Sequence, residues 1–261
     1  MATIAGLDRS GQPQRETPAI VLDCRDHGES DLIVTFFCRQ HGRVTGIAKG
    51  ARRSKKRFVN KLELFTSLVI RHTLPQNNRL AFINEAELLD SFLGLRQNSS
   101  SYITASVIRE HVLLATKEME GDEELYPLLI WAFHSLDSDR PPLPTLTFFL
   151  VRFFSVIGYS PELEYCSSCG VLLLDSPNHS FYSPGGSMRC SRCTAKESRG
   201  KVRLSQGTLK SLVMGLHQPL ERLSRLQLSE NSRREALTFL HAYGRRLFQR
   251  EIVSWSFLKE L

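Results

Sequence analysis

The first part of the chain alternates between apolar and polar positions with the period of β-strands. The segment 62–74 shows this best, since its apolar side chains fall on one parity, at Leu62, Leu64, Leu68, Ile70 and Leu74. Period two over such a length is typical of a strand with one buried face. Three earlier segments have strand length and are rich in β-branched and aromatic residues: 18–26, 31–39 and 44–50. A fifth strand is predicted at 79–88, with Leu80 and Phe82 on one face.

Five short strands within about 70 residues predict a small closed barrel, and the OB-fold is the five-stranded barrel that commonly binds oligonucleotides. Beyond residue 88 the period changes to that of helices. Helical spacing of apolar residues predicts four helices: 98–119, 123–138, 145–158 and 232–250. The third is apolar nearly all round, which indicates the buried centre of a second domain. Pro141, Pro142 and Pro144 are predicted to lie in the link before it.

Charge sharpens this picture, because residues 32–62 hold nine basic side chains and no acidic one, whereas the rest of the chain is slightly acidic. Such a local cluster attracts a polyanion, and nucleic acid is the commonest one. The segment reads as a strand that runs into a loop, so contact would be mainly with phosphate and only weakly sequence-specific. A solvated basic loop without a partner is the alternative. The candidate DNA-binding residues are Arg43, Lys49, Arg52, Arg53, Lys55, Lys56, Arg57 and Lys61.

Two further features belong to this charge pattern. Phe58, inside the basic segment, is either a base-stacking residue or a plug of the barrel. The C-terminal stretch 196–261 is basic again, with arginines along the predicted helix 232–250. Those arginines form either a solvated helix face or a secondary site for DNA or for an acidic protein segment.

Four of the six cysteines form two CxxC pairs, Cys166 with Cys169 and Cys190 with Cys193. Two such pairs about twenty residues apart predict a four-cysteine zinc site in a zinc ribbon. The intervening sequence is predicted to form a hairpin, with an apolar strand, a turn at SPNH, a strand around Phe181 and a PGG turn. Because four thiolates leave no open coordination position, the metal would be structural, one Zn²⁺ per chain. A redox CxxC, an iron–sulfur cluster and a metal-free site are the alternatives, while Cys24 and Cys38 read as small core residues.

Motifs for catalysis are missing: neither a phosphate-binding GxxxxGK[ST] loop nor GxSxG or HExxH occurs. An acidic cluster at Asp23, Asp26, Glu29 and Asp31 reads as a turn with solvated carboxylates beside the basic loop. The sequence therefore predicts a binding protein and no enzyme. The alternatives are a nucleic-acid-modifying enzyme, such as a nuclease with a structural zinc, and a protein-interaction scaffold.

The expected organisation is an α+β multidomain protein with three parts. Residues 1–17 form a flexible tail, 18–87 the OB-fold barrel, and 88–261 a helical domain with an embedded four-cysteine zinc ribbon at about 160–200. No apolar run approaches the roughly 18 residues that a membrane span needs. The N-terminus lacks the pattern of a secretory signal, so we expect a cytoplasmic protein without membrane contact.

Two stretches resemble the RecO family of bacterial recombination mediators. HGESDLIVTFFCRQHGRVTGIAKGARRSKKRF resembles its N-terminal signature, and IGYSPELEYCSSCG resembles the entry to its zinc ribbon, which Cys190 and Cys193 complete. The resemblance covers roughly residues 18–250. It implies an OB-fold, a helical domain and a zinc ribbon.

The resemblance also implies the activity and the partners. A member of this family would bind single- and double-stranded DNA and anneal complementary strands. With RecR, it would load RecA onto DNA that is coated by single-strand-binding protein. It would also bind the acidic C-terminal tail of that coating protein, for which the basic region around Arg233–Arg250 is a reasonable place. No family motif assigns the tail to particular residues.

Overall fold

The computed structural model describes residues 3–7, 13–73, 80–138, 140–175, 180–182, 186–194 and 201–260. Its contacts divide the chain into two compact units, each built from two stretches. The first unit joins Met1–Gln97 to Val112–Phe133, and the second joins Asn98–His111 to His134–Leu261. The sequence predicted a single boundary between residues 87 and 88, and the structure instead assigns a later segment to the first unit as well.

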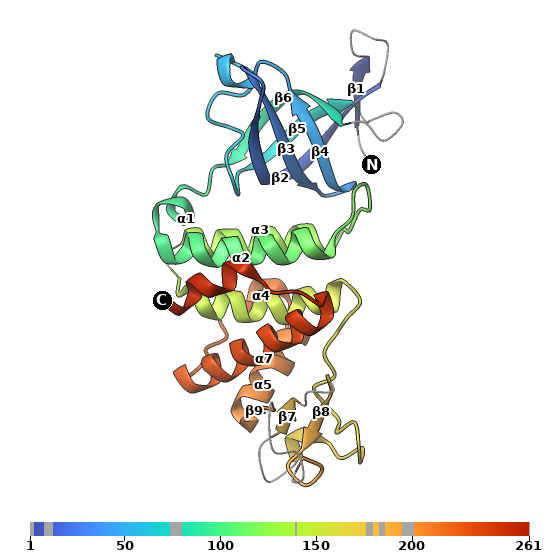
Figure 1. The fold of residues 1–261 in the computed structure, drawn as a ribbon, viewed down its shortest axis with the longest axis vertical. Helices are drawn as coiled ribbons and strands as arrows, with labels where there is room; N and C mark the ends of the chain where they lie inside the picture. Colours follow the sequence, from blue (N-terminus) through green and yellow to red (C-terminus); the bar gives the residue numbers. More distant parts are fainter. Residues whose placement is uncertain are drawn as a thin grey trace. The chain divides into compact units, whose positions relative to one another are not determined.

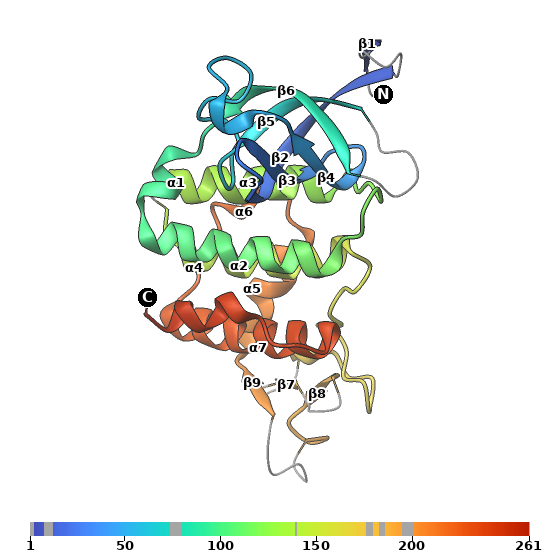
Figure 2. The ribbon, with the colours of Figure 1, turned by 45° about the horizontal axis from the view of Figure 1, so that its top comes forward.

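Six strands form the sheet of the first unit: β1 (Thr3–Leu7), β2 (Pro13–His27), β3 (Asp31–Cys38), β4 (Gly42–Ala48), β5 (Ser67–Thr73) and β6 (Ala81–Asp90). Their order is β1-β2-β3-β4-β6-β5, and β5 also pairs with β2. This last pairing closes β2 to β6 into a five-stranded barrel, whose strands curve around one another in Figures 1 and 2. Neighbouring strands run antiparallel except β4 and β6, which are parallel. The predicted five-stranded barrel is confirmed.

The barrel interior is filled by alternate residues of all five strands. Val34 and Phe36 of β3 are fully buried, as are Leu68 and Ile70 of β5. Phe58 and Leu62, from the segment between β4 and β5, complete the same core. Because these side chains leave water together, they supply the main favourable free energy of this unit.

Two predictions about this region are wrong in part. The predicted flexible tail at 1–17 contains β1 and the start of β2, because β2 continues upstream of Pro18 by pairing with β5 from Arg15 onward. The predicted strand at 62–74 begins only at Ser67. Asn60 and Phe65 have φ angles of 55° and 71°, which end the extended conformation before the strand. Leu74 lies outside the described residues.

The face assigned to Leu80 and Phe82 is the outer face of the barrel. Ala81 and Ile83 point inward and are buried, whereas Phe82 keeps 43% of its surface exposed. The physical reason lies in β4, where Gly46 has no side chain. A Cβ atom at Gly46 would come within 2.6 Å of Cδ1 of Ile83, so Ile83 fills the interior beside the glycine. This fixes the parity of β6 and turns Phe82 toward solvent.

The remaining elements are mostly helical: η1 (Ala51–Arg53), α1 (Leu93–Gln97), α2 (Ser99–Ala115), α3 (Leu125–Asp137), α4 (Pro142–Val156), η2 (Leu173–Asp175), α5 (Gln206–His217), α6 (Leu220–Leu223), α7 (Glu230–Phe248) and η3 (Val253–Glu260). Three short strands, β7 (Ser180–Tyr182), β8 (Met188–Cys190) and β9 (Val202–Leu204), form a separate sheet in the order β8-β7-β9 (Figure 1).

Helix α4 is the buried centre of the second unit, as its apolar sequence predicts. Nine of its residues are buried, and its Phe149 and Phe153 rings stack at 5.6 Å. Pro142 and Pro144 lie in the first turn of the helix and not in a link, since proline lacks the N–H group that a first turn leaves unpaired. No helix in the described part of the chain is both long enough and apolar enough to span a bilayer.

Candidate nucleic-acid interface and metal centre

The segment between β4 and β5 carries most of the basic candidates, and it is fixed to the barrel by two of them. We call residues 49–61 the basic loop. Arg57 donates from Nη2 to the carbonyl of Lys49 (3.0 Å) and from Nη1 to the carbonyl of Asn84 on β6 (3.2 Å). Lys61 Nζ donates to the carbonyl of Ala86, two residues further along β6, at 2.7 Å. The basic loop is therefore anchored along β6.

Beneath these anchors, Phe58 is a plug of the barrel. It keeps only 3% of its surface exposed and belongs to the barrel core, and the Arg57 guanidinium lies 5.0 Å from its ring centroid. Of the two readings that the sequence left open for Phe58, the structure supports core packing. Ser54 Oγ accepts from the backbone N–H groups of Arg57 and Phe58, which closes the turn before the plug.

Arg43 also makes contacts within the protein. Its Nε forms an ion pair with Glu118 Oε1 at 3.1 Å, and its Nη1 donates to the carbonyl of Leu113 at 3.0 Å. Glu118 also accepts from the backbone N–H and hydroxyl of Thr45. This contact lies within the first unit and holds the stretch after α2 against β4. Arg43, Arg57 and Lys61 thus each donate to oxygen atoms of the protein itself, although Arg57 is still exposed.

Besides Arg57, five candidates of the basic loop are exposed: Lys49, Arg52, Arg53, Lys55 and Lys56. Arg52 pairs with Asp26 at 3.2 Å and Arg53 with Glu29 at 3.5 Å, both between solvent-exposed side chains. Exposed ion pairs of this kind contribute little to stability, with a median of about 0–1 kcal/mol. A phosphate can therefore replace Asp26 or Glu29 at small cost.

The acidic cluster around the turn between β2 and β3 also contacts the basic loop. Asp31 Oδ1 accepts from the backbone N–H of Gly50 at 2.8 Å and from Ser30 Oγ at 3.1 Å. The Gly50 hydrogen bond lowers the pKa of the Asp31 carboxyl, so this contact is complete at neutral pH. Asp26, Glu29 and Asp31 are thus each engaged with the basic loop. Among the described residues, only the four cysteines form a group suited to a metal ion.

One exposed aromatic residue next to the basic loop was missed by the sequence analysis. Phe82 lies on the outer face of β6, and Lys49 Nζ is 4.9 Å from the centroid of its ring. The alternation of apolar residues in β6 grouped Phe82 with Leu80 but could not decide which face of the strand was buried.

The four predicted metal ligands come together in the second unit. The Sγ atoms of Cys166, Cys169, Cys190 and Cys193 all lie within 4.8 Å of one another. The Cys169 and Cys190 sulfurs are 3.7 Å apart. A tetrahedral zinc ion with Zn–S distances of about 2.3 Å would hold its sulfurs about 3.8 Å apart. The thiol cluster therefore has the dimensions of a four-coordinate metal site.

Backbone geometry shapes this cluster. Gly170 follows the first pair with a φ of 70°, and its N–H donates to the carbonyl of Cys166 at 2.8 Å. The N–H of Ser167 donates to the carbonyl of Met188 at 3.0 Å, which ties the first CxxC turn to β8. The predicted strand around Phe181 is confirmed as β7, but the predicted hairpin is wrong: Leu173–Asp175 forms the 3-10 helix η2 and no apolar strand, and β7 pairs instead with β8. The SPNH turn lies outside the described residues.

The pKa values of the clustered thiols are shifted in opposite directions. Burial acts to raise the pKa of Cys166, but hydrogen bonds from the backbone N–H groups of Cys190, Ser168 and Cys169 outweigh it and lower the pKa to about 6. Hydrogen bonds with Cys169 and Cys190 raise the pKa of Cys193 to about 12, so it retains its proton in the metal-free cluster. A cation at the centre would displace that proton, because thiolate is the metal-binding form. The donor set fits a metal that binds four thiolates.

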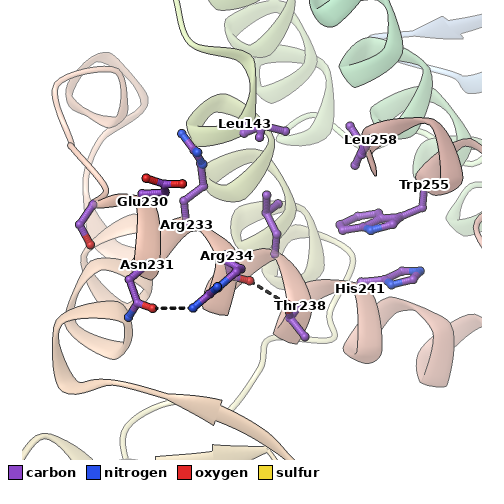
Figure 3. Close-up of a pocket in the computed structure, with 11 residues that line it drawn as sticks. Leu143, Glu230, Asn231, Arg233, Arg234, Thr238, His241, Trp255 and Leu258 are labelled. Carbon is purple, nitrogen blue, oxygen red and sulfur yellow. Dashed lines mark hydrogen bonds between the residues drawn. The ribbon is translucent and has the colours of Figure 1, made fainter. Parts of the chain in front are cut away.

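A groove of about 770 Å³ runs along the first half of α7 within the second unit. Leu143 of α4, Leu237 of α7 and Leu258 of η3 supply its apolar part, and Arg233 and Arg234 its positive part (Figure 3). The Trp255 and His241 rings stack at 4.4 Å at one end. Part of the predicted basic region Arg233–Arg250 thus lines a groove. The more C-terminal Arg245, Arg246 and Arg250 lie around a separate, open depression.

The chain thus combines an OB-type barrel, which carries an anchored lysine- and arginine-rich loop, with a helical unit that carries a four-thiol site. Family models agree: the one described as "Recombination protein O N terminal" matches residues 14–92, and "Recombination protein O C terminal" matches residues 96–256. The chain therefore belongs to the RecO family.

Curated relatives support this assignment over the whole length. "DNA repair protein RecO" of Syntrophobacter fumaroxidans (strain DSM 10017 / MPOB) is 32% identical over 244 residues, which cover 94% of this chain and 96% of the relative. The protein of the same name from Desulfatibacillum aliphaticivorans is 31% identical, over 95% of this chain and 98% of the relative. That of Syntrophus aciditrophicus (strain SB) is 29% identical, over 94% and 95%.

Proposed function

We propose that this chain is a DNA-binding recombination mediator that binds single- and double-stranded DNA through the basic loop and anneals complementary strands. The observation that carries the proposal is that some cations of the loop anchor it and others do not. Arg57 and Lys61 anchor it to β6, while Lys49, Arg52, Arg53, Lys55 and Lys56 stay exposed. A positive surface that is already ordered needs little further ordering to bind phosphate.

Annealing follows from phosphate binding without a catalytic step. Two complementary strands repel each other through their phosphates, and lysine and arginine side chains neutralise part of that charge. Because the exposed cations contact backbone and not base edges, any pair of complementary strands is a substrate. Family membership further supports work with RecR to load RecA onto DNA coated by single-strand-binding protein.

The basic loop is tested by removing four exposed charges and leaving the anchors intact. We expect Arg52→Ala/Arg53→Ala/Lys55→Ala/Lys56→Ala to weaken single-stranded DNA binding, measured by fluorescence anisotropy over a series of NaCl concentrations. The slope of log affinity against log salt should become shallower by roughly 0.7 for each phosphate that the variant no longer neutralises. Thermal unfolding should change little, since the removed side chains make only exposed ion pairs.

A control variant removes the same number of charges from the second unit: Arg222→Ala/Arg225→Ala/Arg245→Ala/Arg250→Ala. It separates a site on the loop from an effect of net charge. If the control variant binds DNA more weakly and with a shallower slope while the loop variant behaves like wild type, DNA binds at the C-terminal arginines and the proposed loop site is wrong.

We further propose that the groove along α7 receives the acidic C-terminal tail of single-strand-binding protein. The groove combines what such a tail needs: a leucine-lined apolar part for a terminal side chain, and Arg233 and Arg234 for carboxylates. Its location within the basic region at 233–250 agrees with the charge pattern of the sequence.

This groove is tested with a labelled synthetic peptide that has several aspartates and ends in an apolar residue with a free carboxylate. Arg233→Glu/Arg234→Glu should weaken its binding at least about tenfold, because repulsion replaces attraction. Arg222→Glu/Arg225→Glu, with the same charge change outside the groove, should retain it. Equal weakening in both variants would mean that the peptide senses only net charge.

Finally, we propose that the four cysteines hold one structural Zn²⁺ per chain. Purified protein should contain about one zinc per chain by inductively coupled plasma mass spectrometry, and Cys166→Ala should lose it. Because the site lies in the second unit, this variant should lower the unfolding temperature of the protein yet leave affinity for single-stranded DNA largely intact. The control is Cys24→Ala, which changes a half-buried cysteine of the barrel; this variant should retain zinc. Iron in place of zinc would contradict the assignment.

A further inference from the structure

The basic loop explains contact with phosphate, but phosphates are common to single strands and duplexes. We propose that Phe82 is a stacking platform for an unpaired nucleobase and makes this barrel bind single strands more tightly than duplexes. The proposal rests on the proposed DNA binding at the basic loop and adds a base-binding subsite to it. Neither the cysteine site nor the groove along α7 takes part.

The first observation is that Phe82 is exposed on a rigid support. It keeps 43% of its surface in water although its neighbours Ala81 and Ile83 are buried. Both edges of its strand are paired, with Ile47 of β4 on one side and Thr73 of β5 on the other. A ring on a central strand is already positioned before any ligand arrives, so little conformational entropy is lost on stacking.

The second observation is that the ring lies beside the phosphate-binding groups. Lys49 Nζ is 4.9 Å from the ring centroid, and Arg57 joins the Lys49 carbonyl to that of Asn84, two residues after Phe82. The anchored loop and the ring are therefore held on one surface of the barrel. A strand whose phosphates reach the loop cations brings its bases next to Phe82.

The third observation is that the aromatic residue inside the basic loop is not available to stack on a base. Phe58, the only phenylalanine within the basic loop, is buried as the barrel plug and cannot meet a base without unfolding the core. A single exposed phenylalanine is common on protein surfaces and needs no function by itself. Here the fixed strand and the neighbouring cation distinguish Phe82, because single-strand-binding surfaces combine a positive track with aromatic platforms.

Duplex DNA offers no such contact, since its bases are stacked on one another and their faces are covered. Stacking on Phe82 therefore stabilises only a strand with an accessible base. It is also independent of salt, because no counterion is released when a base meets a neutral ring. Phosphate contact by the loop and base contact by Phe82 can thus be separated experimentally.

The test compares Phe82→Leu with wild type on single- and double-stranded DNA of equal length by fluorescence anisotropy. We expect affinity for the single strand to fall about tenfold, with the salt slope unchanged and duplex affinity within about twofold. Phe82→Tyr, which keeps the ring, should bind like wild type, and Leu80→Ala, at the neighbouring exposed apolar position, should also do so. Equal weakening on both DNA forms, or none on the single strand, would overturn the proposal.

A second measurement uses wild-type protein alone and so does not depend on the folding of a variant. An oligonucleotide with the same phosphates but abasic sites in place of its bases should bind about tenfold more weakly than the normal strand. If both strands bind equally while the loop variant still shows weaker binding, Phe82 is not a platform and the phosphate site stands. If wild-type protein binds neither strand at any salt concentration, the proposed function itself fails.

Discussion

The anchoring of the basic loop along β6 is the constraint on which the proposed nucleic-acid surface depends. An excess of like charge in one loop would drive its side chains apart and keep the backbone disordered. Here Arg57 and Lys61 direct donors to the backbone carbonyls of Lys49, Asn84 and Ala86. With Phe58 buried in the barrel core, these hydrogen bonds hold the backbone of the loop, and with it the remaining cations, along β6.

In the free protein, acidic residues contact the basic loop in two different ways. Asp26 and Glu29 neutralise Arg52 and Arg53 through exposed pairs that cost little to break. Asp31, in contrast, accepts a hydrogen bond from the Gly50 backbone N–H group. A polyanion that binds the loop would therefore replace the exposed ion pairs of Asp26 and Glu29. The hydrogen bond between Asp31 and Gly50 would stay in place.

Much of this could be predicted from the sequence, because strand periodicity and CxxC spacing are local signals. The barrel, helix α4 and the four clustered cysteines all follow from them. The sequence could not show which cations bind the protein itself, because Arg43, Arg57 and Arg52 are the same type of residue. They differ only in which carbonyl or carboxylate the fold brings near. The burial of Phe58 and the exposure of Phe82 could not be predicted either, because the first depends on packing in the barrel core and the second on Gly46 in another strand.

The proposed location of DNA on the anchored loop and the neighbouring part of β6 is tested most directly by hydrogen–deuterium exchange of the full chain with and without a saturating single-stranded oligonucleotide. We expect slower exchange at the amides of residues 49–57 and 81–84, with little change along α7. Slower exchange confined to residues 233–250, with the loop unchanged, would contradict this location and move the DNA site to the second unit.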